Sequence, residues 1–594
     1  MYKDYHTFAQ PENAVVKHLS LNLNVDFEKN ILSGFANWNI EMHNNASEII
    51  FDTRDLIIEK IVLNDDSTAA KFELKPTVKF LGNALHIPIS SNTKSVKIFY
   101  HTSPNASAVQ WLQPEQTAGK KQKFMFTQSE AILARTWIPC QDGPGIRFTY
   151  DATIHCPKNL MAVMSVANNA TELNKDGVYQ YSQPKPIPSY LMALAVGEIA
   201  FKKIDNRCGI YAELPMVEKT AWEFADMGKM VDAAEKLYGA YAWGRYDVIV
   251  LPPSFPFGGM ENPCLTFATP TVVAGDRSLV SLVAHELAHS WSGNLTTNAT
   301  WNDFWLNEGF TVYFEQRIME ALYGKDYSEM LASLSVQDVK QTIKDLGEKN
   351  PDTNLKLNLK DRDPDDGMND IAYIKGYLFL RLMEEKVGRE KWDAFVKNYF
   401  SNHAFKSITT EEFVQVLNDS LITPNKEKLA EVNINDWIYS PGLPANAPVI
   451  NSSRFDAVDV QINNFTKDNL VDKTIAAKWS THEWLHFINN LPEKLSEKQL
   501  NDLDAEFHFT GSSNCEIADA WYVVALKNNY SKAFEAMDKF LCTVGRRKFL
   551  LPLYGEMNKT ESGKKLAHQI YAKARSGYHS VAQQTLDEML ADKK

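Results

Sequence analysis

The sequence feature that most constrains this chain is the run His285-Glu286-Leu287-Ala288-His289. In an α-helix, side chains four residues apart lie on one face, one turn apart, so the two imidazoles can bind a single metal ion. This spacing is typical of zinc sites, and the glutamate between the histidines can act as a base on a water that the metal makes acidic. Because a catalytic zinc usually takes three protein ligands and keeps a fourth position open, the run predicts one further ligand.

Glu308 is the candidate for that third ligand. It lies in an apolar run, residues 304–314, which predicts a second helix packed on the first. The alternative is a helix whose two histidines face solvent without a metal. The apolar character of the first helix disfavours this alternative, because a buried motif without metal would leave several polar groups unsatisfied. The sequence therefore predicts one zinc ion per chain, bound by His285, His289 and Glu308.

Length, charge and cysteine usage limit the class of protein. A chain of 594 residues is too long for one hydrophobic core, so we expect several domains. The net charge of -12 at pH 7, with no basic cluster to offset it, disfavours a nucleic-acid partner. The six cysteines form no Cys-x-x-Cys pair, which is typical of reduced thiols in a reducing compartment.

The N-terminal residues lack the apolar core of a signal peptide. No window of the sequence approaches the ~20 apolar residues of a membrane span. We therefore expect a cytoplasmic protein without membrane contact, and the sequence leaves its oligomeric state open.

The pattern of apolar residues changes twice along the chain. It begins with strict alternation, as in Leu19, Leu21 and Leu23, which predicts half-buried strands and an antiparallel β domain. The pattern then becomes mixed and mostly helical, and a proline-rich linker precedes a stretch of helical periodicity. The expected fold is therefore a multidomain α+β protein. Its expected parts are a β domain at 1–200, a mixed domain at 201–443, a linker at 444–455 and a helical domain at 456–594.

A second candidate segment is Gly258-Gly259-Met260-Glu261. Two adjacent glycines bring a backbone close to another group, and an extended segment with free N–H and C=O groups can pair with a peptide in β fashion. Glu261 would then place a carboxylate at the end of that ladder. The alternative is a tight turn with an exposed acid. Glu130, in the β domain, is by itself typical of a solvated or paired charge.

Tyr373 and the run Arg546-Arg547-Lys548 are further candidates. A tyrosine beside zinc can stabilise an oxyanion, although most tyrosines belong to a core. Three cations without a nearby acid form either a solvated helix end or a carboxylate clamp. A calcium loop at 361–372 is excluded, because its glycine falls one position late and Ala372 stands where the bidentate glutamate is needed.

These motifs together resemble the gluzincin aminopeptidases of peptidase family M1, and most closely their leukotriene A(4) hydrolase branch. The resemblance rests on the zinc motif with Glu308 and on the preceding Gly258-Gly259-Met260-Glu261-Asn262. It extends over essentially the whole chain through residues 111–117, 251–256 and 439–444. It implies an N-terminal β saddle, a thermolysin-like mixed α/β catalytic domain and a C-terminal α-helical, armadillo-like domain.

The resemblance also implies roles for single residues. Glu261 and Glu130 would bind the free α-amine of a peptide, and Tyr373 would stabilise the oxyanion. The residues implied in substrate binding are Glu130, Gly258, Gly259, Met260, Glu261, Asp365 in the substrate channel, and Arg546 and Lys548 at the terminal carboxylate.

The sequence therefore predicts a zinc aminopeptidase that removes the N-terminal residue from short peptides with a free N-terminus. Glu286 would be the general base that takes a proton from the zinc-activated water and passes it to the leaving amine. One alternative is a bifunctional enzyme that also hydrolyses a fatty epoxide. Two departures from that branch weaken the epoxide-hydrolase alternative. Glu130 stands where that branch has a glutamine, and Met368 stands where it has a tyrosine. The other alternative is an inactive peptide-binding scaffold, which predicts a damaged zinc set.

Overall fold

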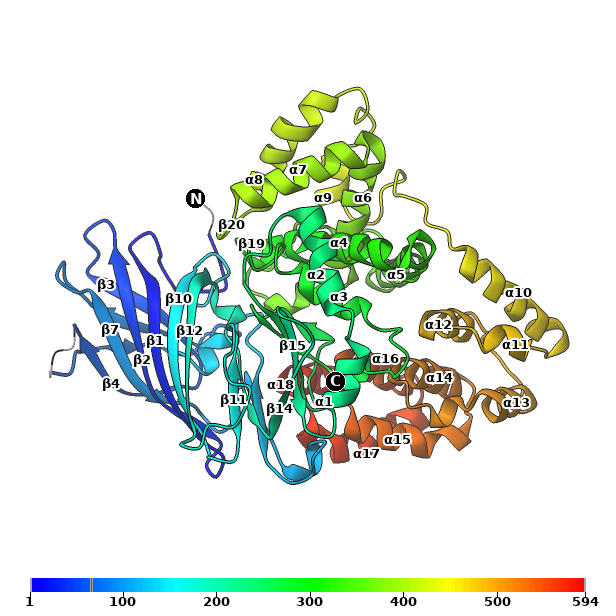
Figure 1. The fold of residues 1–594 in the computed structure, drawn as a ribbon, viewed down its shortest axis with the longest axis horizontal. Helices are drawn as coiled ribbons and strands as arrows, with labels where there is room; N and C mark the ends of the chain where they lie inside the picture. The colour runs from blue at the N-terminus through cyan, green and yellow to red at the C-terminus, as the bar shows by residue number, and fades with distance from the viewer. Residues whose placement is uncertain (1–2, 65, 67, 592–594) are drawn as a thin grey trace.

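The computed structural model describes residues 3–64, 66 and 68–591. The chain forms a β-rich part, a mixed central part and a helical C-terminal part, which lie next to one another in Figure 1. One buried apolar cluster runs through the first two parts, and a second lies within the C-terminal helices. The predicted multidomain α+β class is confirmed.

The β-rich part is built on a six-stranded sheet. Leu19, Leu21 and Leu23, which alternate with polar residues in the sequence, are buried on one face of it. The expectation of antiparallel pairing is wrong at one place, since β1 pairs in parallel with β10. The long connection between these two strands allows them to run in the same direction. The strands, in order across the sheet, are β12 (Val178–Ile187), β10 (Phe148–His155), β1 (Ala14–Asp26), β2 (Ile31–Met42), β7 (Ser95–His101) and β4 (Ile57–Leu63).

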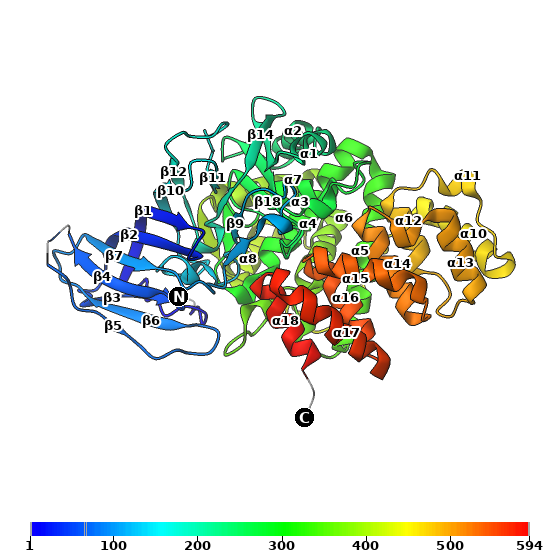
Figure 2. The ribbon, with the colours of Figure 1, turned by 90° about the horizontal axis from the view of Figure 1, so that it is seen from below.

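Two smaller sheets complete this part. One contains β3 (Glu48–Thr53), β6 (Asn83–Pro88) and β5 (Glu73–Leu74). The other contains β11 (Met161–Met164), β13 (Leu194–Gly197), β9 (Phe124–Thr127) and β8 (Val109–Leu112). Figure 2 shows β9 on the side that adjoins the central part. The loop that follows β9 carries Glu130.

The central part contains a five-stranded sheet whose last strand is short. Its middle strands are parallel, and β17 pairs antiparallel with β18 at the edge. Because β17 has no second neighbour in this sheet, one side of its backbone is free to pair with another extended segment. The strand order is β14 (Ile199–Lys203), β15 (Cys208–Glu213), β16 (Tyr246–Val250), β18 (Leu265–Ala268) and β17 (Gly259–Met260).

The helices of the central part surround α4 (Trp305–Tyr323), which is buried on nearly all sides. Such a helix belongs in the middle of a domain, where every face meets a packing partner. A Cβ on Gly309 would lie 2.9 Å from the Cα of Gly376, so two glycines let α4 and α6 approach closely. The other elements are α1 (Val217–Glu223), α2 (Met227–Tyr238), α3 (Ser281–Ala288), β19 (Thr296–Asn298), α5 (Lys325–Leu346), α6 (Gly376–Val387), α7 (Arg389–Asn402), β20 (Lys406–Ile408), α8 (Thr410–Leu417) and α9 (Ile434–Ile438).

The C-terminal part is entirely helical in the residues described. Trp521, Met537 and Leu541, which carry the helical period in the sequence, lie in its core. Among the described residues, no helix is both long and apolar enough to cross a membrane. The helices are α10 (Ser453–Asp468), α11 (Lys473–Ala476), α12 (Thr481–Asn489), α13 (Glu497–Phe507), α14 (Cys515–Lys527), α15 (Phe534–Thr543), α16 (Arg547–Met557), α17 (Glu561–Ala574) and α18 (Ser580–Leu590).

Candidate active site

The residues proposed as metal ligands meet where α3 packs against α4. His285 lies in the last turn of α3, and Glu308 lies in the first turn of α4. His289 falls just after α3, but its helical backbone dihedrals preserve the one-turn spacing. His285 Nε2 lies 3.3 Å and His289 Nε2 lies 3.6 Å from Glu308 Oε2. All three side chains therefore direct a ligand atom at one point.

Hydrogen bonds at the other ring nitrogens fix the orientation of both imidazoles. His285 Nδ1 lies 3.1 Å from Glu315 Oε2, and His289 Nδ1 lies 3.0 Å from the carbonyl oxygen of Ser292. Carboxylates and carbonyls only accept, so each Nδ1 carries the proton. Each Nε2 is then left with a lone pair directed toward Glu308, which is the arrangement that a metal needs.

The chemistry of these groups fits a zinc ion. Glu308 Oε2 is buried and makes no hydrogen bond among the described residues, and the same holds for Glu286 Oε2. A buried carboxylate oxygen without a partner is costly unless a cation or a proton meets it. Two neutral imidazoles and one carboxylate are a donor set that catalytic zinc uses, with one position left open.

Glu286 lies beside this set and against the edge strand β17. A Cβ on Gly259 would lie 2.2 Å from Glu286 Oε1, so only glycine leaves room for the carboxylate. Burial raises the pKa of Glu286 well above its ordinary value, His285 opposes this, and Glu261 adds to it. A carboxylate with a raised pKa binds a proton more readily, as a general base must.

In the segment Gly258-Gly259-Met260-Glu261, Gly259 and Met260 form strand β17, and Gly258 lies in the bend before it. Glu261 is buried at the end of β17, where its Oε1 lies 3.4 Å from the Asn307 amide. The Met260 side chain is also buried, and its sulfur accepts a hydrogen bond from Gln128. Met260 can therefore contact a substrate only through its backbone.

Glu130 lies in the loop after β9, 8% exposed, in a cluster of acidic residues. Burial raises the pKa of Glu130 well above its ordinary value, and repulsion by Glu261 and Glu308 adds to this. Asp365, in the turn at Pro364–Gly367, joins the same cluster, and burial raises its pKa to about 7. Such a concentration of carboxylates favours the binding of cations.

Tyr373 lies in a turn of π-helix, Ile371–Lys375, that leads into α6. Its ring stacks on His285 with 6.2 Å between centroids. Burial raises the pKa of Tyr373 well above its ordinary value, and Glu308 raises it further. The hydroxyl is therefore a neutral donor beside the metal-binding set, which is what an oxyanion requires.

Arg546 reaches the glycine segment from the C-terminal part. Its side chain is 9% exposed, and Nη1 donates to Thr271 Oγ1 at 3.1 Å. A Cβ on Gly258 would lie 2.8 Å from Nη2, so the guanidinium lies directly against the glycine segment. The sequence also placed Lys548 here, and it lies on the first turn of α16 with its side chain 56% exposed.

The expectation that these cations lack an acid is wrong. Glu516, on α14, lies 3.3 Å from Arg546 and 2.7 Å from Lys548. No local pattern reveals this pairing, because Glu516 precedes the cations on another helix. Two other residues missed from the sequence orient the histidines. Glu315 follows Glu308 by two turns on the same face of α4, so helical spacing could have found it. Asn307 precedes Glu308, and its Oδ1 lies 2.9 Å from His289 Nδ1.

Comparison with known proteins identifies the family. Residues 15–191 match the Peptidase M1 N-terminal domain, 222–437 the Peptidase family M1 domain and 479–590 the Leukotriene A4 hydrolase, C-terminal domain. The chain is 36% identical to the leukotriene A-4 hydrolase of Xenopus laevis, over 98% of both chains. The chain belongs to peptidase family M1. The resemblance seen in its motifs is thus confirmed over its full described length.

Two further comparisons support this assignment to the M1 family. The chain is 36% identical to leucine aminopeptidase 2 of Pyricularia oryzae, over 95% of this chain and 94% of that one. The structure of yeast LTA4 hydrolase in complex with bestatin superposes with a TM-score of 0.92 at 30% identity, covering 100% of this chain and 98% of that one. This M1 member is an enzyme, a zinc metallo-aminopeptidase of the leukotriene A4 hydrolase branch, and not an inactive scaffold.

Proposed function

We propose that this enzyme removes the N-terminal residue from short peptides, with Glu286 as the general base. The convergence of His285, His289 and Glu308 on one point, with Glu286 beside it, carries the proposal. These three ligands would hold one zinc ion per chain. The free edge of β17 supports the orientation of a peptide along this set.

Each catalytic side chain has a task that its surroundings support. When bound, zinc polarises the peptide carbonyl and lowers the pKa of a water. Glu286, with its raised pKa, takes a proton from the attacking water and passes it to the leaving amine. Tyr373, a neutral hydroxyl at the ring of His285, donates a hydrogen bond to the carbonyl oxygen as it becomes negative.

Both ends of the peptide would be recognised by charge. Glu130 and Glu261 bind the α-amine, because both are buried carboxylates and an ammonium group relieves their mutual repulsion. Asp365 lines the same region. Arg546 and Lys548 bind the terminal carboxylate at the other end, and Glu516 keeps the two cations in place between substrates. The backbone at 258–260 aligns the chain between these ends.

We also propose a cytoplasmic location and the domain boundaries expected from the sequence. All six cysteines are free thiols, which suits a reducing compartment. The linker proposed at 444–455 is supported over 444–452, because the described residues between α9 and α10 form no regular element. This supports ending the catalytic domain at 443, whereas α10 begins at Ser453, three residues before the start proposed for the helical domain at 456.

One experiment tests the proposal. Zinc is measured in the purified enzyme, and hydrolysis is followed with amino-acid arylamides and with their N-acetylated forms. We expect one zinc per chain, loss of activity on chelation and no hydrolysis of the acetylated substrates. Glu286→Gln should retain zinc and lose about 10²- to 10⁴-fold in kcat. An active Glu286→Gln enzyme would refute the mechanism, and cleavage of acetylated substrates would refute the role of Glu130 and Glu261.

A second candidate function is favoured by one observation, the name of the Xenopus laevis relative, a leukotriene A-4 hydrolase. The same zinc set would then also open a fatty epoxide. Glu130 places a buried carboxyl group beside Glu261, which favours an ammonium group over an apolar chain. Direct assay of epoxide opening decides between one activity and two.

A further inference from the structure

Glu130 is held beside the other acidic residues of the site by contacts that its own side chain does not make. Its Oε1 is buried and has no hydrogen-bond partner among the described residues. Besides the cost of burial, Glu261 and Glu308 repel it. Neighbouring acids disfavour the charged form of a buried carboxyl group, and Glu130 Oε1 makes no described contact that would hold the loop at 129–136 in place. The loop therefore needs an anchor in its backbone or in its other side chains.

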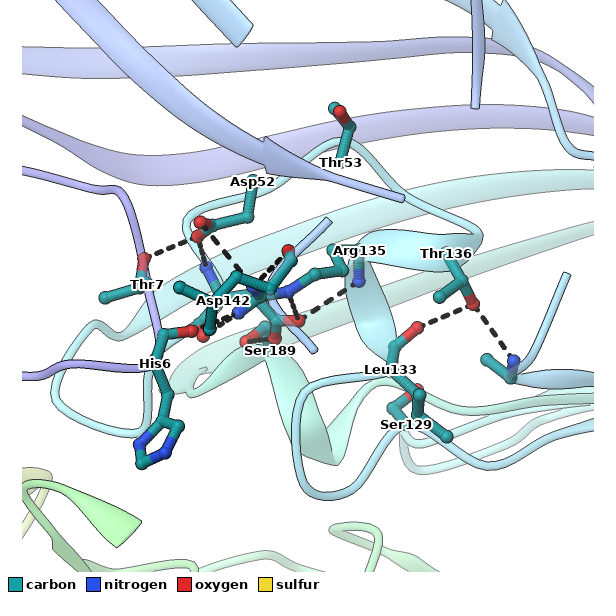
Figure 3. A network of polar contacts seen from close by, with 12 residues as sticks. His6, Thr7, Asp52, Thr53, Ser129, Leu133, Arg135, Thr136, Asp142 and Ser189 are labelled. Carbon is teal, nitrogen blue, oxygen red and sulfur yellow. Dashed lines mark hydrogen bonds and ion pairs between the residues drawn. The ribbon is translucent and has the colours of Figure 1, made fainter. Parts of the chain in front are cut away.

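Arg135, in the same loop, provides that anchor. Its side chain is fully buried, and Nε donates to Asp142 Oδ2 at 2.9 Å. Nη1 donates to the carbonyl of Leu81 at 2.8 Å, and Nη2 donates to the carbonyl of His6 at 2.6 Å. A planar guanidinium with partners on several sides fixes direction as well as distance. Figure 3 shows Arg135 with His6 and Asp142 beside it.

Further hydrogen bonds hold the two acids of this network, Asp142 and Asp52, in place. Asp142 also accepts from Ser189 Oγ at 2.6 Å, and its N–H donates to Asp52 at 2.7 Å. Asp52 in turn accepts from Thr7 Oγ1 at 2.5 Å and from the N–H of Phe8 at 2.7 Å. The N-terminal segment thus closes over the network, as Figure 3 shows.

His6 extends the network to the second acidic loop. Its ring is buried, and Nε2 lies 3.0 Å from the carbonyl of Leu359 and 3.2 Å from that of Arg362. These carbonyls belong to the segment that leads into Asp365. The Ala131 backbone, in the Glu130 loop, hydrogen-bonds to Asp365. His6 therefore contacts both loops. Its ring contacts the segment before Asp365, and its carbonyl accepts a hydrogen bond from Arg135, the anchor of the Glu130 loop.

We propose that His6 and Arg135 are positioning residues that hold the loops of Glu130 and Asp365 at the candidate active site and so set the affinity for the peptide amine. This rests on the proposed function, in which Glu130 binds that amine. Neither residue touches the substrate. Loss of either lets the loops relax outward, so peptide binding weakens while the zinc ligands and Glu286 stay in place.

The experiment measures KM, kcat, zinc content and thermal unfolding of His6→Ala in the full-length zinc enzyme, with an alanine arylamide as substrate. We expect KM to rise roughly threefold to tenfold, the scale of coupling within one network, with kcat and zinc content unchanged. His86→Ala is the matched control, because the His86 ring also makes a hydrogen bond in the β-rich part, to Glu48 at 2.9 Å across β3 and β6, but contacts neither loop. It should leave KM unchanged.

A double-mutant cycle separates positioning from stability. In a Glu130→Gln background, His6→Ala should add little to KM, because the group that it positions is already altered. Arg135→Lys keeps the charge but loses the planar fork, and should raise KM like His6→Ala if it folds.

Four outcomes would overturn the proposal. His6→Ala could lower the unfolding temperature without changing KM, which would make the network merely structural. His6→Ala could raise KM equally in both backgrounds, which would mean that it acts elsewhere. If Glu130→Gln itself left KM unchanged, the amine-binding role would fail, and this inference would fail with it. If Glu130→Gln raised KM and His6→Ala did not, only the inference would fail.

Discussion

Gly259→Ala is the substitution whose effect follows most directly from the geometry. The new Cβ would lie 2.2 Å from Glu286 Oε1 and 2.4 Å from its Cδ, whereas ordinary contact begins at 3.4 Å. Either the carboxylate or β17 must therefore move by about 1 Å. A misplacement of this size at a reacting group costs about 10²-fold in rate, or about 2.7 kcal/mol in activation free energy. We expect kcat to fall by about that factor.

The assay compares kcat, zinc content and unfolding temperature of Gly259→Ala with those of Gly555→Ala. Gly555 lies in α16, and a Cβ there meets no atom within 4 Å, so this control should retain full activity. Zinc content should be unchanged in both, because no zinc ligand is displaced. In a Glu286→Gln background, Gly259→Ala should cost little more. A Gly259→Ala enzyme with the original kcat would refute the placement of Glu286 against β17.

Two further predictions concern stability. Zinc removal by a chelator should lower the unfolding temperature by on the order of 5 °C, because the buried oxygen of Glu308 loses its partner. Return of zinc should restore the temperature. An unchanged unfolding temperature in the metal-free enzyme would contradict the zinc site. Burial lowers the pKa of Lys375 to about 7, so above that pH the unfolded chain binds the extra proton and stability rises with pH until about 10. Unfolding temperatures across this window should rise less in Lys375→Met, and equal slopes would show that Lys375 stays charged in the folded enzyme.

The sequence predicted those features that depend on local periodicity. The histidine pair repeats at one helical turn, and Glu308 lies in an apolar run that had to be a buried helix. The alternation at Leu19 and Leu21 likewise required a half-buried strand. Each of these features is determined by neighbours within a few residues, so the pattern alone is informative.

Features formed by distant segments could not be predicted in this way. Glu516 meets Arg546 only because α14 packs beside α16, and β1 runs parallel to β10 only because of a long connection. Arg135 carries no local sign of its burial, since its hydrogen-bond partners come from three separate segments of the chain. An isolated charged residue in a loop is expected to face solvent unless the tertiary structure supplies partners for it.

The length of the preferred peptide follows from two neighbouring glycines. A Cβ on Gly258 would touch Arg546, and one on Gly259 would touch Glu286, so the carboxylate clamp and the general base lie no more than about 12 Å apart. An extended peptide covers that distance in about three residues. Peptides of two to four residues should therefore reach both groups at once, and kcat/KM for an alanine series should fall beyond about four residues. The fall should disappear in Arg546→Gln or with C-terminal amides. If kcat/KM fell equally for Arg546→Gln and for C-terminal amides, steric limits of the site, and not recognition of the terminal carboxylate, would set the preferred peptide length.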